Sequence, residues 1–277
     1  MKKILFSGLA ALLVSACVSA QELKVAVYGD NREGTNIHSK IISKINEYNP
    51  RDVFNTGDAV KYGRRHEWRA FNEAIFPIDD VDTDYHLAFG NHDKNKSLFG
   101  EQQGPLERFW HLPEKPTFYS FDRGRTHFII LDTNIISEGK KQEQWLEKDL
   151  KENNSKDYIF VFMHHPPIGD DEHGKRDDKY TDLSIRFAEV LRKYHPSAVF
   201  TGHQHHYRKL DVNGVTYIIT GGGGAPLRVR VPQEVDEGST RTNHYVLGKI
   251  DRNAQFRVLG LNDRLIDSFS IEKRNVK

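Results

Sequence analysis

Cysteine is almost absent from this sequence of 277 residues, which contains only Cys17. A single thiol cannot close a disulfide within the chain, so a fold stapled by disulfides is excluded even in an oxidising compartment. The stability of the folded chain must therefore come from a buried hydrophobic core.

Long apolar runs are also missing. The uncharged run at residues 4–16 is too short to cross a hydrocarbon core, which needs about 20 apolar residues in a helix, and no later stretch approaches that length. Because Lys2 and Lys3 precede this run and small residues end it, the run predicts a secretory signal. We expect an exported protein, periplasmic or extracellular, with no membrane-spanning segment.

Two processing routes fit the end of the signal. Cleavage after Ala20, with Val18 two residues before it, gives a signal peptide of residues 1–20 and a mature chain of residues 21–277. The alternative is lipidation of Cys17 in the sequence Val14-Ser15-Ala16-Cys17, which leaves the protein on a lipid anchor. Both routes lead out of the cytoplasm.

No Pro/Ser-rich linker or shift in composition divides residues 21–277, and we predict a single domain over that range. An excess of charge of one sign is missing as well. The chain has 40 Lys and Arg against 39 Asp and Glu, a net charge of +1. No basic face is implied, so nucleic acid is not an expected partner. The sequence leaves the oligomeric state open.

Short runs rich in β-branched and aromatic residues predict strands, and most are apolar throughout, as in buried strands. These strands are predicted at 23–28, 53–55, 85–89, 127–131, 158–163 and 198–200. Helical periodicity lies between them at 35–48, 142–150 and 182–194, so we expect α/β layers. Further strand-like segments suggest antiparallel hairpins in a second sheet packed on the first, at 217–220, 245–250, 256–261 and 268–272.

Five of the apolar runs end in small residues and residues that can bind metal. These clusters are Gly29-Asp30-Asn31-Arg32, Gly57-Asp58, Gly90-Asn91-His92-Asp93, His164-His165-Pro166-Pro167 and Gly202-His203-Gln204-His205. Glycine before a ligand lets the backbone turn sharply at the strand end. Because the carboxyl ends of strands in an open α/β sheet form one rim, where ligands bind, we expect all five clusters to converge there.

The residue types fit the hydrolysis of a phosphate ester. That reaction brings hydroxide to a phosphorus shielded by negative oxygens, and two metal ions about 3.5 to 4 Å apart generate the hydroxide and neutralise charge. Carboxylate can bridge two ions, and a mixed Asp/Asn/His set fits transition metals. His92 could protonate a leaving group if Asp93 holds its ring.

In order and spacing, these clusters resemble the calcineurin-like metallophosphoesterase superfamily, which includes the purple acid phosphatases and many bacterial phosphodiesterases. The resemblance covers Val25 to about His206. It implies an α/β (α+β) fold, a four-layer sandwich of two mixed β-sheets flanked by α-helices, with two metal ions per chain (iron, manganese or zinc). By position it implies that Asp58 bridges the metals, that Asn91, His164 and His203 complete one site, that Asp30 and His205 bind the other ion, and that His92 is the proton donor.

The chain departs from the family pattern at Arg32, where many relatives carry a histidine. A guanidinium stays protonated and cannot bind a cation, so one metal site is a ligand short. His38 is the nearest candidate for that ligand because it shares a helical face with Ile41 and Ile45; the alternative is a core histidine satisfied by backbone. Arg32 itself is predicted to bind a phosphate oxygen.

Three further features allow two interpretations each. His165 could replace His164 as the ligand, although only one of two adjacent residues normally points to the same side of an extended backbone. Gly221–Gly224 predicts a tight turn rather than a phosphate cradle, because the P-loop lysine is missing. The charged stretch 169–179 predicts a solvated loop, or alternatively one wall of the substrate cleft.

The sequence thus predicts an exported phosphomonoesterase or phosphodiesterase that acts on small-molecule phosphate esters. A serine hydrolase is disfavoured because no Gly-x-Ser-x-Gly elbow is present. The alternative is a degenerate metal-binding or phosphate-binding module of the same fold without turnover. His92 favours the enzyme, because a binding module has no need of a proton donor beside the metals.

Overall fold

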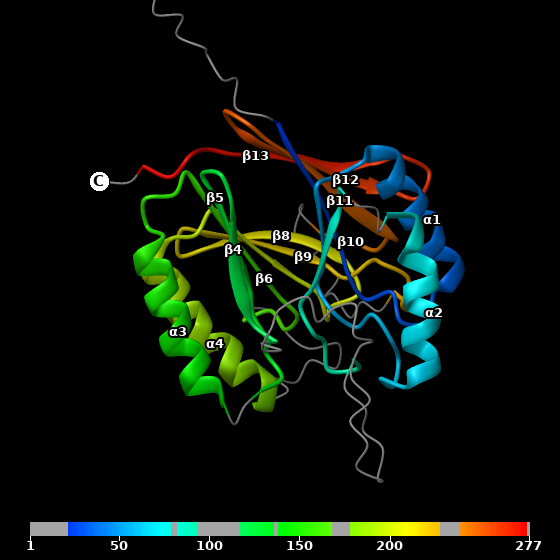
Figure 1. Cartoon of the computed structure of the whole chain (residues 1–277), viewed down its shortest axis with the longest axis horizontal. Coiled ribbons are helices and arrows are strands. Elements are labelled where there is room, and N and C mark those ends of the chain that lie inside the picture. The colour runs from blue at the N-terminus through cyan, green and yellow to red at the C-terminus, as the bar shows by residue number, and fades with distance from the viewer. Residues whose placement is uncertain are drawn as a thin grey trace, which may run out of the picture.

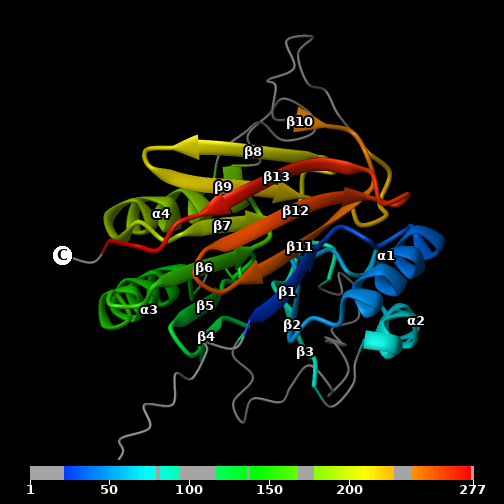
Figure 2. The ribbon, with the colours of Figure 1, turned by 90° about the horizontal axis from the view of Figure 1, so that it is seen from above.

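Two β-sheets lie face to face, and a pair of helices covers the outer face of each (Figure 1 and Figure 2). The computed structural model describes residues 22–78, 82–93, 117–135, 138–167, 178–227 and 239–275. Both sheets contain parallel and antiparallel pairs. The expected four-layer sandwich of mixed sheets is confirmed.

The six-stranded sheet has the order β13-β12-β11-β1-β2-β3. One half is parallel and consists of β1 (Leu23–Tyr28), β2 (Asp52–Asn55) and β3 (Asp84–Leu87). The other half is an antiparallel meander of β11 (His244–Ile250), β12 (Ala254–Gly260) and β13 (Leu265–Ile271). The two halves join where β11 pairs antiparallel with β1.

The seven-stranded sheet has the order β10-β8-β9-β7-β6-β5-β4. Its parallel centre consists of β5 (Thr126–Ile130), β6 (Tyr158–Met163), β7 (Ala198–Thr201) and β9 (Val215–Thr220). Antiparallel neighbours extend it on both sides, namely β4 (Tyr119–Arg123), β8 (Tyr207–Val212) and β10 (Ser239–Thr240).

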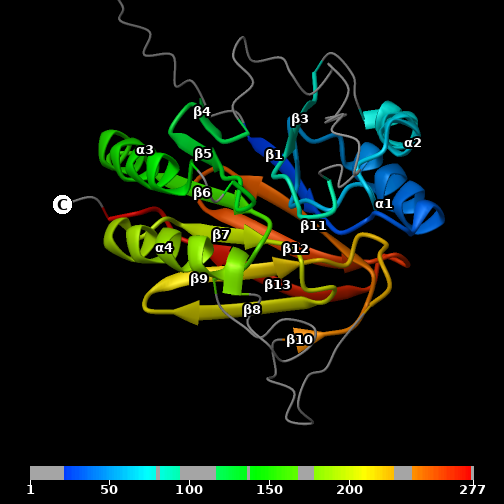
Figure 3. The same ribbon diagram turned by 90° about the horizontal axis from the view of Figure 1, so that it is seen from below.

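The helices lie on the two outer faces of the sandwich (Figure 3). The six-stranded sheet is covered by α1 (Thr35–Tyr48), α2 (Arg65–Ile75) and the short 3-10 helix η1 (Phe76–Ile78). The seven-stranded sheet is covered by α3 (Gly139–Glu152) and α4 (Asp178–Tyr194). Each helix packs an apolar stripe on its sheet, as the 3.6-residue periodicity of the sequence predicts.

The core follows the two-residue alternation of the strands. In β1, Val25 and Val27 pack between the sheets, whereas Ala26 faces the helices. Between the sheets the contact is largely aromatic, and Phe54 of β2 stacks on Phe162 of β6 with ring centroids 3.9 Å apart. This aromatic layer fixes the separation of the two sheets and therefore of the strand ends that carry the polar clusters.

The prediction of a separate second sheet for the C-terminal strands is wrong. The strands β11, β12 and β13 extend the six-stranded sheet that begins with β1. The strands β8 and β9 belong to the seven-stranded sheet, together with β5, β6 and β7. The physical reason is that β11 pairs with the edge of β1, about 220 residues earlier in the chain, and no local pattern of residues marks such a distant partner. The helix α2 and the strands β4 and β8 were not predicted.

The part of the chain described here contains no helix with the length and apolar character needed to cross a bilayer. The predicted signal at residues 1–20, Cys17 included, lies outside the described residues. So do residues 168–177, which contain most of the charged stretch predicted as a loop or cleft wall.

Candidate metal centre

The five predicted clusters lie at strand ends, but on two sheets instead of one rim. Those after β1, β2 and β3 belong to the six-stranded sheet, and those after β6 and β7 to the seven-stranded sheet. Because the two sheets are packed face to face with these ends on the same side, the two rims meet. The prediction that one sheet carries all five clusters is wrong. The clusters nevertheless converge, because the rims of the two sheets lie side by side.

Three of the predicted ligands adopt the left-handed backbone conformation that residues other than glycine rarely use. The φ angles are 58° for Asp30, 54° for Asp58 and 68° for His203. Such a residue costs of order 1–3 kcal/mol and persists only where the surrounding structure imposes it. It turns the side chain back toward the strand ends, and the sharp turn falls on the ligands themselves.

The glycines before the ligands allow close approach of carboxylates to backbone. Asp30 Oδ2 accepts the N–H of His203 at 2.9 Å, and a Cβ on Gly202 would lie 2.5 Å from that oxygen. Asp58 Oδ1 accepts the N–H of His92 at 2.9 Å, and a Cβ on Gly90 would lie 2.2 Å from it. Of the glycines in the five clusters, only Gly57 has a positive φ, so the predicted sharp turn at glycine holds there alone.

Three imidazoles have their tautomer fixed by a backbone carbonyl. The Nδ1 atoms of His164, His205 and His92 lie 2.8, 2.8 and 2.7 Å from the carbonyl oxygens of Thr56, Pro226 and Lys61, respectively. A carbonyl can only accept, so each Nδ1 carries the proton and donates it. In the neutral rings the lone pair is then on Nε2, the arrangement that metal-binding histidines use.

Two of these Nε2 atoms, those of His164 and His205, face oxygen acceptors and no donor. His164 Nε2 lies 3.2 Å from Asn91 Oδ1 and 3.4 Å from Asp58 Oδ1, and His205 Nε2 lies 3.5 Å from Asp30 Oδ1. Within the described residues, Asp30 Oδ1 is buried without a hydrogen bond. Lone pairs that face each other in a buried site repel, and a cation among them removes that repulsion. The donor set therefore fits metal ions.

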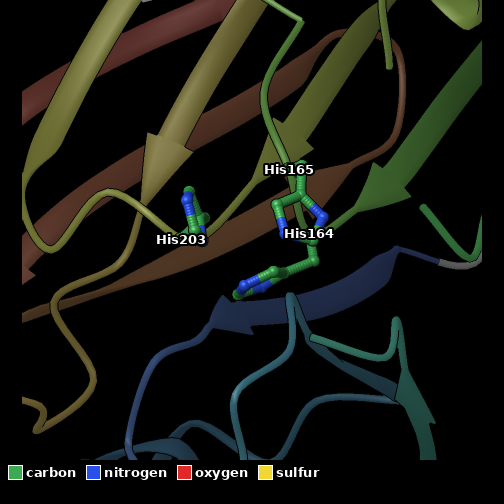
Figure 4. A group of neighbouring side chains, drawn as sticks. All are labelled: His164, His165 and His203. Atoms are coloured by element: carbon green, nitrogen blue, oxygen red, sulfur yellow. The ribbon is translucent and has the colours of Figure 1, made fainter. Parts of the chain in front are cut away.

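The ligand atoms are also near enough to share ions. Those of Asp30, Asp58 and His164 lie within 4.8 Å of one another, and so do those of His164, His165 and His203. Figure 4 shows the three histidines gathered at the ends of β6 and β7. His165 also bonds through Nδ1 to Thr133 Oγ1 at 2.6 Å. Both members of the His164-His165 pair thus face the centre.

The electrostatics keep these groups ready to bind a cation. Burial raises the pKa of Asp30, but the interactions of its carboxylate with His205, His164 and His203 outweigh burial and leave that pKa below its ordinary value. Burial lowers the pKa of His203 to about 4. At pH 7 the carboxylate is therefore charged and the His203 ring neutral, which are the forms that coordinate metals.

Arg32 lies against the centre without being able to bind a metal. Its Nε is 3.5 Å from Asp58 Oδ2 and its Nη1 is 3.3 Å from His92 Nδ1. Because His92 Nδ1 already donates to Lys61, the contact with Arg32 is not a hydrogen bond accepted by the ring. The guanidinium is thus positioned beside the predicted bridging ligand and the predicted proton donor, as a phosphate-binding group requires.

Asp93 does not hold the ring of His92, so that part of the prediction is wrong. Its carboxylate accepts three backbone N–H groups, from Asp58 at 2.9 Å, Gly90 at 2.7 Å and Val60 at 3.1 Å. Asp93 therefore shapes the turn that presents Asp58. The ring of His92 is held by the Lys61 carbonyl, which sequence reasoning could not identify because every residue has such a group.

His38 is not brought to the other site residues. Its Nε2 lies 2.9 Å from the hydroxyl of Tyr28, and its ring stacks on Phe71 with centroids 5.5 Å apart. Burial lowers the pKa of His38 to about 3, so the ring is a neutral core group. The alternative of a core histidine fits this position, although a tyrosine hydroxyl rather than backbone is its partner.

The glycine run at 221–224 packs tightly against the first cluster. Gly223 N–H donates to Gly29 O at 2.8 Å, and Ala225 N–H donates to Asp30 O at 2.7 Å. These two amides are therefore not available to a phosphate. The run lets the following Pro226 carbonyl reach His205, and it acts as the predicted close-approaching turn.

A family model described as calcineurin-like phosphoesterase matches residues 23–207. The chain belongs to the calcineurin-like phosphoesterase family. The chain is 26% identical over 224 residues to "Probable purple acid phosphatase 20" of Arabidopsis thaliana, covering 73% of the chain and 52% of the relative. It is also 26% identical over 215 residues to "Probable inactive purple acid phosphatase 1" of the same plant, covering 63% of the chain and 35% of the relative.

A purple acid phosphatase from yellow lupin (Lupinus luteus) seeds has a similar solved structure. The TM-score is 0.72 at 20% identity, over 91% of this chain and 54% of the lupin chain. At that identity the likeness concerns the fold. The chain spans about half, or less, of the length of these plant relatives.

Proposed function

We propose that this protein hydrolyses small-molecule phosphate esters with two metal ions. The observation that carries the proposal is the group of buried acceptor atoms that face one another where the two sheets meet. The residues that would hold the ions are Asp30, Asp58, Asn91, His164, His203 and His205, with Asp58 between the two. Bound there, iron, manganese or zinc supplies hydroxide and neutralises the phosphate charge.

Two residues that bind no metal would act on the substrate. The Arg32 guanidinium binds phosphate oxygens through its planar N–H fork. His92 is oriented by its Nδ1–H donation to Lys61. In the imidazolium form of the ring the second proton would be on Nε2, from which it would pass to the departing oxygen and leave the neutral Nδ1–H ring. Both residues lie next to Asp58, which supports binding and proton transfer at the same phosphorus.

The alternative is a module of the same fold that binds metal or phosphate without turnover. The relative named as inactive keeps this alternative open. The orientation of His92 favours an enzyme, because a binding module has no need of a fixed proton donor.

Metal analysis of the purified mature protein, followed by assays of nitrophenyl phosphate mono- and diesters, tests the proposal. We expect close to two metal ions per chain and turnover of at least one ester class, which also decides between monoesterase and diesterase. Asp58→Asn should lose both ions and activity together by orders of magnitude. Metal-loaded protein without turnover of either ester would favour the binding module, and full activity with two metals in Asp58→Asn would refute the bridging role.

His92→Ala tests the proton donor separately. We expect the metal content to stay while the rate falls by about 10² to 10⁴-fold for alkyl esters, whose leaving oxygens need a proton. The rate for nitrophenyl esters should fall little, because nitrophenolate leaves without a proton. An equal loss for both ester types would contradict the role.

We also propose that the protein is exported, as the start of the sequence predicts. Mass spectrometry of the mature N-terminus would separate the two processing routes. A free Gln21 terminus means signal cleavage after Ala20, and an acylated Cys17 means a lipid anchor. An intact Met1 terminus in the native host would contradict export.

A further inference from the structure

The loop at residues 61–64, between Asp58 and helix α2, carries the group that orients the proposed proton donor. The Lys61 carbonyl oxygen lies 2.7 Å from His92 Nδ1. A carbonyl in a surface loop orients a ring only as well as the loop itself is held. The contacts that hold this loop therefore bear on the direction of His92 Nε2.

One carboxylate oxygen holds the loop on both sides of Gly63. Glu67 Oε2 accepts the N–H of Tyr62 at 3.1 Å and the N–H of Arg64 at 2.8 Å. Gly63 between them has φ 66°, so the chain reverses around the carboxylate. The residue bonded to His92 is thus the immediate neighbour of one of the two amides that Glu67 holds.

Glu67 is a firm anchor because it stands in the first turn of α2. The next residue, Trp68, and Phe71 one turn later are buried under the six-stranded sheet. The helix cannot shift without disturbing that core. On the other side of the loop, Lys61 Nζ is tied to Glu33 Oε1 at 2.7 Å. The backbone of the loop is held by Glu67 of α2, and the Lys61 side chain is held by Glu33, the residue that follows the first cluster.

We propose that Glu67 is a positioning residue for His92. It acts through the loop backbone and the Lys61 carbonyl, and touches neither metal nor substrate. The inference rests on the proposed function, since it concerns the efficiency of proton delivery to the leaving group.

A simpler role for Glu67 is the capping of α2. A glutamate three residues after the N-cap that accepts the N-cap N–H is half of a capping box, which stabilises a helix. A cap alone would lower the stability of the protein and affect all substrates alike. A positioning residue instead lowers the rate in proportion to the need of the leaving group for a proton.

Glu67→Ala, measured on a nitrophenyl ester and on an alkyl ester of the class that the protein cleaves, separates these roles. We expect kcat for the alkyl ester to fall about tenfold, a part of the effect of general acid catalysis, while kcat for the nitrophenyl ester changes less than about twofold. Glu67→Gln keeps an acceptor oxygen and should recover most of the rate. Glu73→Ala, the same change on the exposed side of α2, should leave both rates unchanged.

Combining the change with His92→Ala gives the sharper comparison. If Glu67 acts through His92, Glu67→Ala should lower neither rate further once the imidazole is gone. An equal loss on both esters, or a further loss in the His92→Ala background, would overturn the proposal and leave Glu67 as a cap.

A measurement without turnover keeps this inference separate from the proposed function. Long-range proton–nitrogen NMR of histidine-labelled protein, recorded at a pH where the ring is neutral, should show His92 as the Nδ1–H tautomer in the wild type, assigned by its loss in His92→Ala. In Glu67→Ala the signal should shift toward a mixture of tautomers. An unchanged His92 signal would overturn the positioning role. Absence of ester hydrolysis by the wild type would instead refute the proposed function.

Discussion

At the scale of single residues, the candidate centre is defined by backbone conformations that its own ligands disfavour. Asp30, Asp58 and His203 are all left-handed. Strain of about 1–3 kcal/mol at each position is maintained by the surrounding hydrogen bonds, such as that from the Asp30 N–H to Gly57 O at 2.8 Å. The ligands are thus aimed by the fold before any ion binds, which is the preorganisation that a metal centre needs.

Gly202→Ala tests this close packing. An added Cβ would lie 2.5 Å from Asp30 Oδ2 and 2.8 Å from Thr56 Oγ1, so the carboxylate must move. We expect a loss of about 1–3 kcal/mol in the free energy of unfolding and a fall in metal content toward one ion per chain. Urea denaturation and metal analysis measure the two effects. Gly260→Ala, whose added Cβ would lie 3.3 Å from its nearest neighbour, Asn262 Oδ1, is the matched control. Two ions retained in Gly202→Ala would contradict the assignment of Asp30.

Arg32→Ala tests the substrate contact. The guanidinium lies beside Asp58 and His92, and its removal takes away charge-assisted hydrogen bonds to phosphate but no metal ligand. We expect kcat/KM for phosphate esters to fall about 10- to 100-fold, as the loss of hydrogen bonds to a charged group implies, with both metals still bound. Steady-state kinetics with metal analysis checks this. Arg69→Ala changes an exposed arginine on α2 and should leave kcat/KM unchanged. An unchanged kcat/KM in Arg32→Ala as well would exclude a substrate role for Arg32.

At the scale of elements, ion pairs link strands and a helix in addition to the hydrophobic core. Asp52 at the start of β2 is fully buried and receives both Arg123 Nε at 3.0 Å and Arg123 Nη2 at 2.8 Å from β4. This bidentate pair links β4, the edge strand of the seven-stranded sheet, to β2, the neighbour of the edge strand β3 in the six-stranded sheet. In the seven-stranded sheet, His127 of β5 lies between Asp122 of β4 and Asp149 of α3, at 2.7 and 2.8 Å.

The His127 bridge predicts a pH dependence of stability. Burial lowers the pKa of His127, but the hydrogen bonds to Asp149 and Asp122 outweigh it and leave the pKa above its ordinary value. A raised folded pKa means that the stabilisation is complete below the unfolded value of about 6.5 and is lost as pH rises through the folded pKa. The difference in Tm between the wild type and His127→Gln should therefore be largest at about pH 5 to 6 and smaller at higher pH.

Thermal denaturation of both proteins from acid to alkaline pH measures this difference. His66→Gln, a change of an exposed histidine on α2, controls for the general effect of losing an imidazole. A constant difference in Tm between wild type and His127→Gln across the pH range would show that the ring stabilises the protein only by packing.

At the scale of the whole molecule, the candidate centre lies where the two sheets meet. Asp30, Asp58 and Asn91 come from the six-stranded sheet, and His164, His203 and His205 from the seven-stranded one. Metal ions bound by both sets would cross-link the two halves of the sandwich. Any ligand that binds only the folded state adds its binding free energy to the stability of the fold.

Removal of metal should therefore destabilise the entire protein. At a free metal concentration 100-fold above Kd the added stability is about 2.7 kcal/mol, which for a chain of this size corresponds to a shift in Tm of about 5–10 °C. We expect EDTA to lower Tm by that amount and excess metal to restore it. Asp58→Asn should not respond to EDTA, and an unchanged Tm of the wild type in EDTA would argue against metal bridging the sheets.

Local patterns of residues predict many of the strands and helices of this protein. The strands at 23–28 and 158–163 and the helix at 35–48 occur with the predicted bounds, because a continuous apolar run or a 3.6-residue repeat depends only on near neighbours. Polar clusters at strand ends are equally local. Local patterns were therefore sufficient for the α/β layers and for the polar clusters at the strand ends. The resemblance of those clusters to the family supplied the four-layer sandwich and the proposed ligand set.

Contacts between distant parts of the chain decided the rest. The partners of His92 and His164 are backbone carbonyls of Lys61 and Thr56, and since every residue carries a carbonyl, no residue type marks them in advance. The pairing of β1 with β11 and the separation of the five clusters onto two sheets depend on which strand edges meet after the core has formed. Such choices follow from packing over the whole chain, which no local pattern of residues encodes.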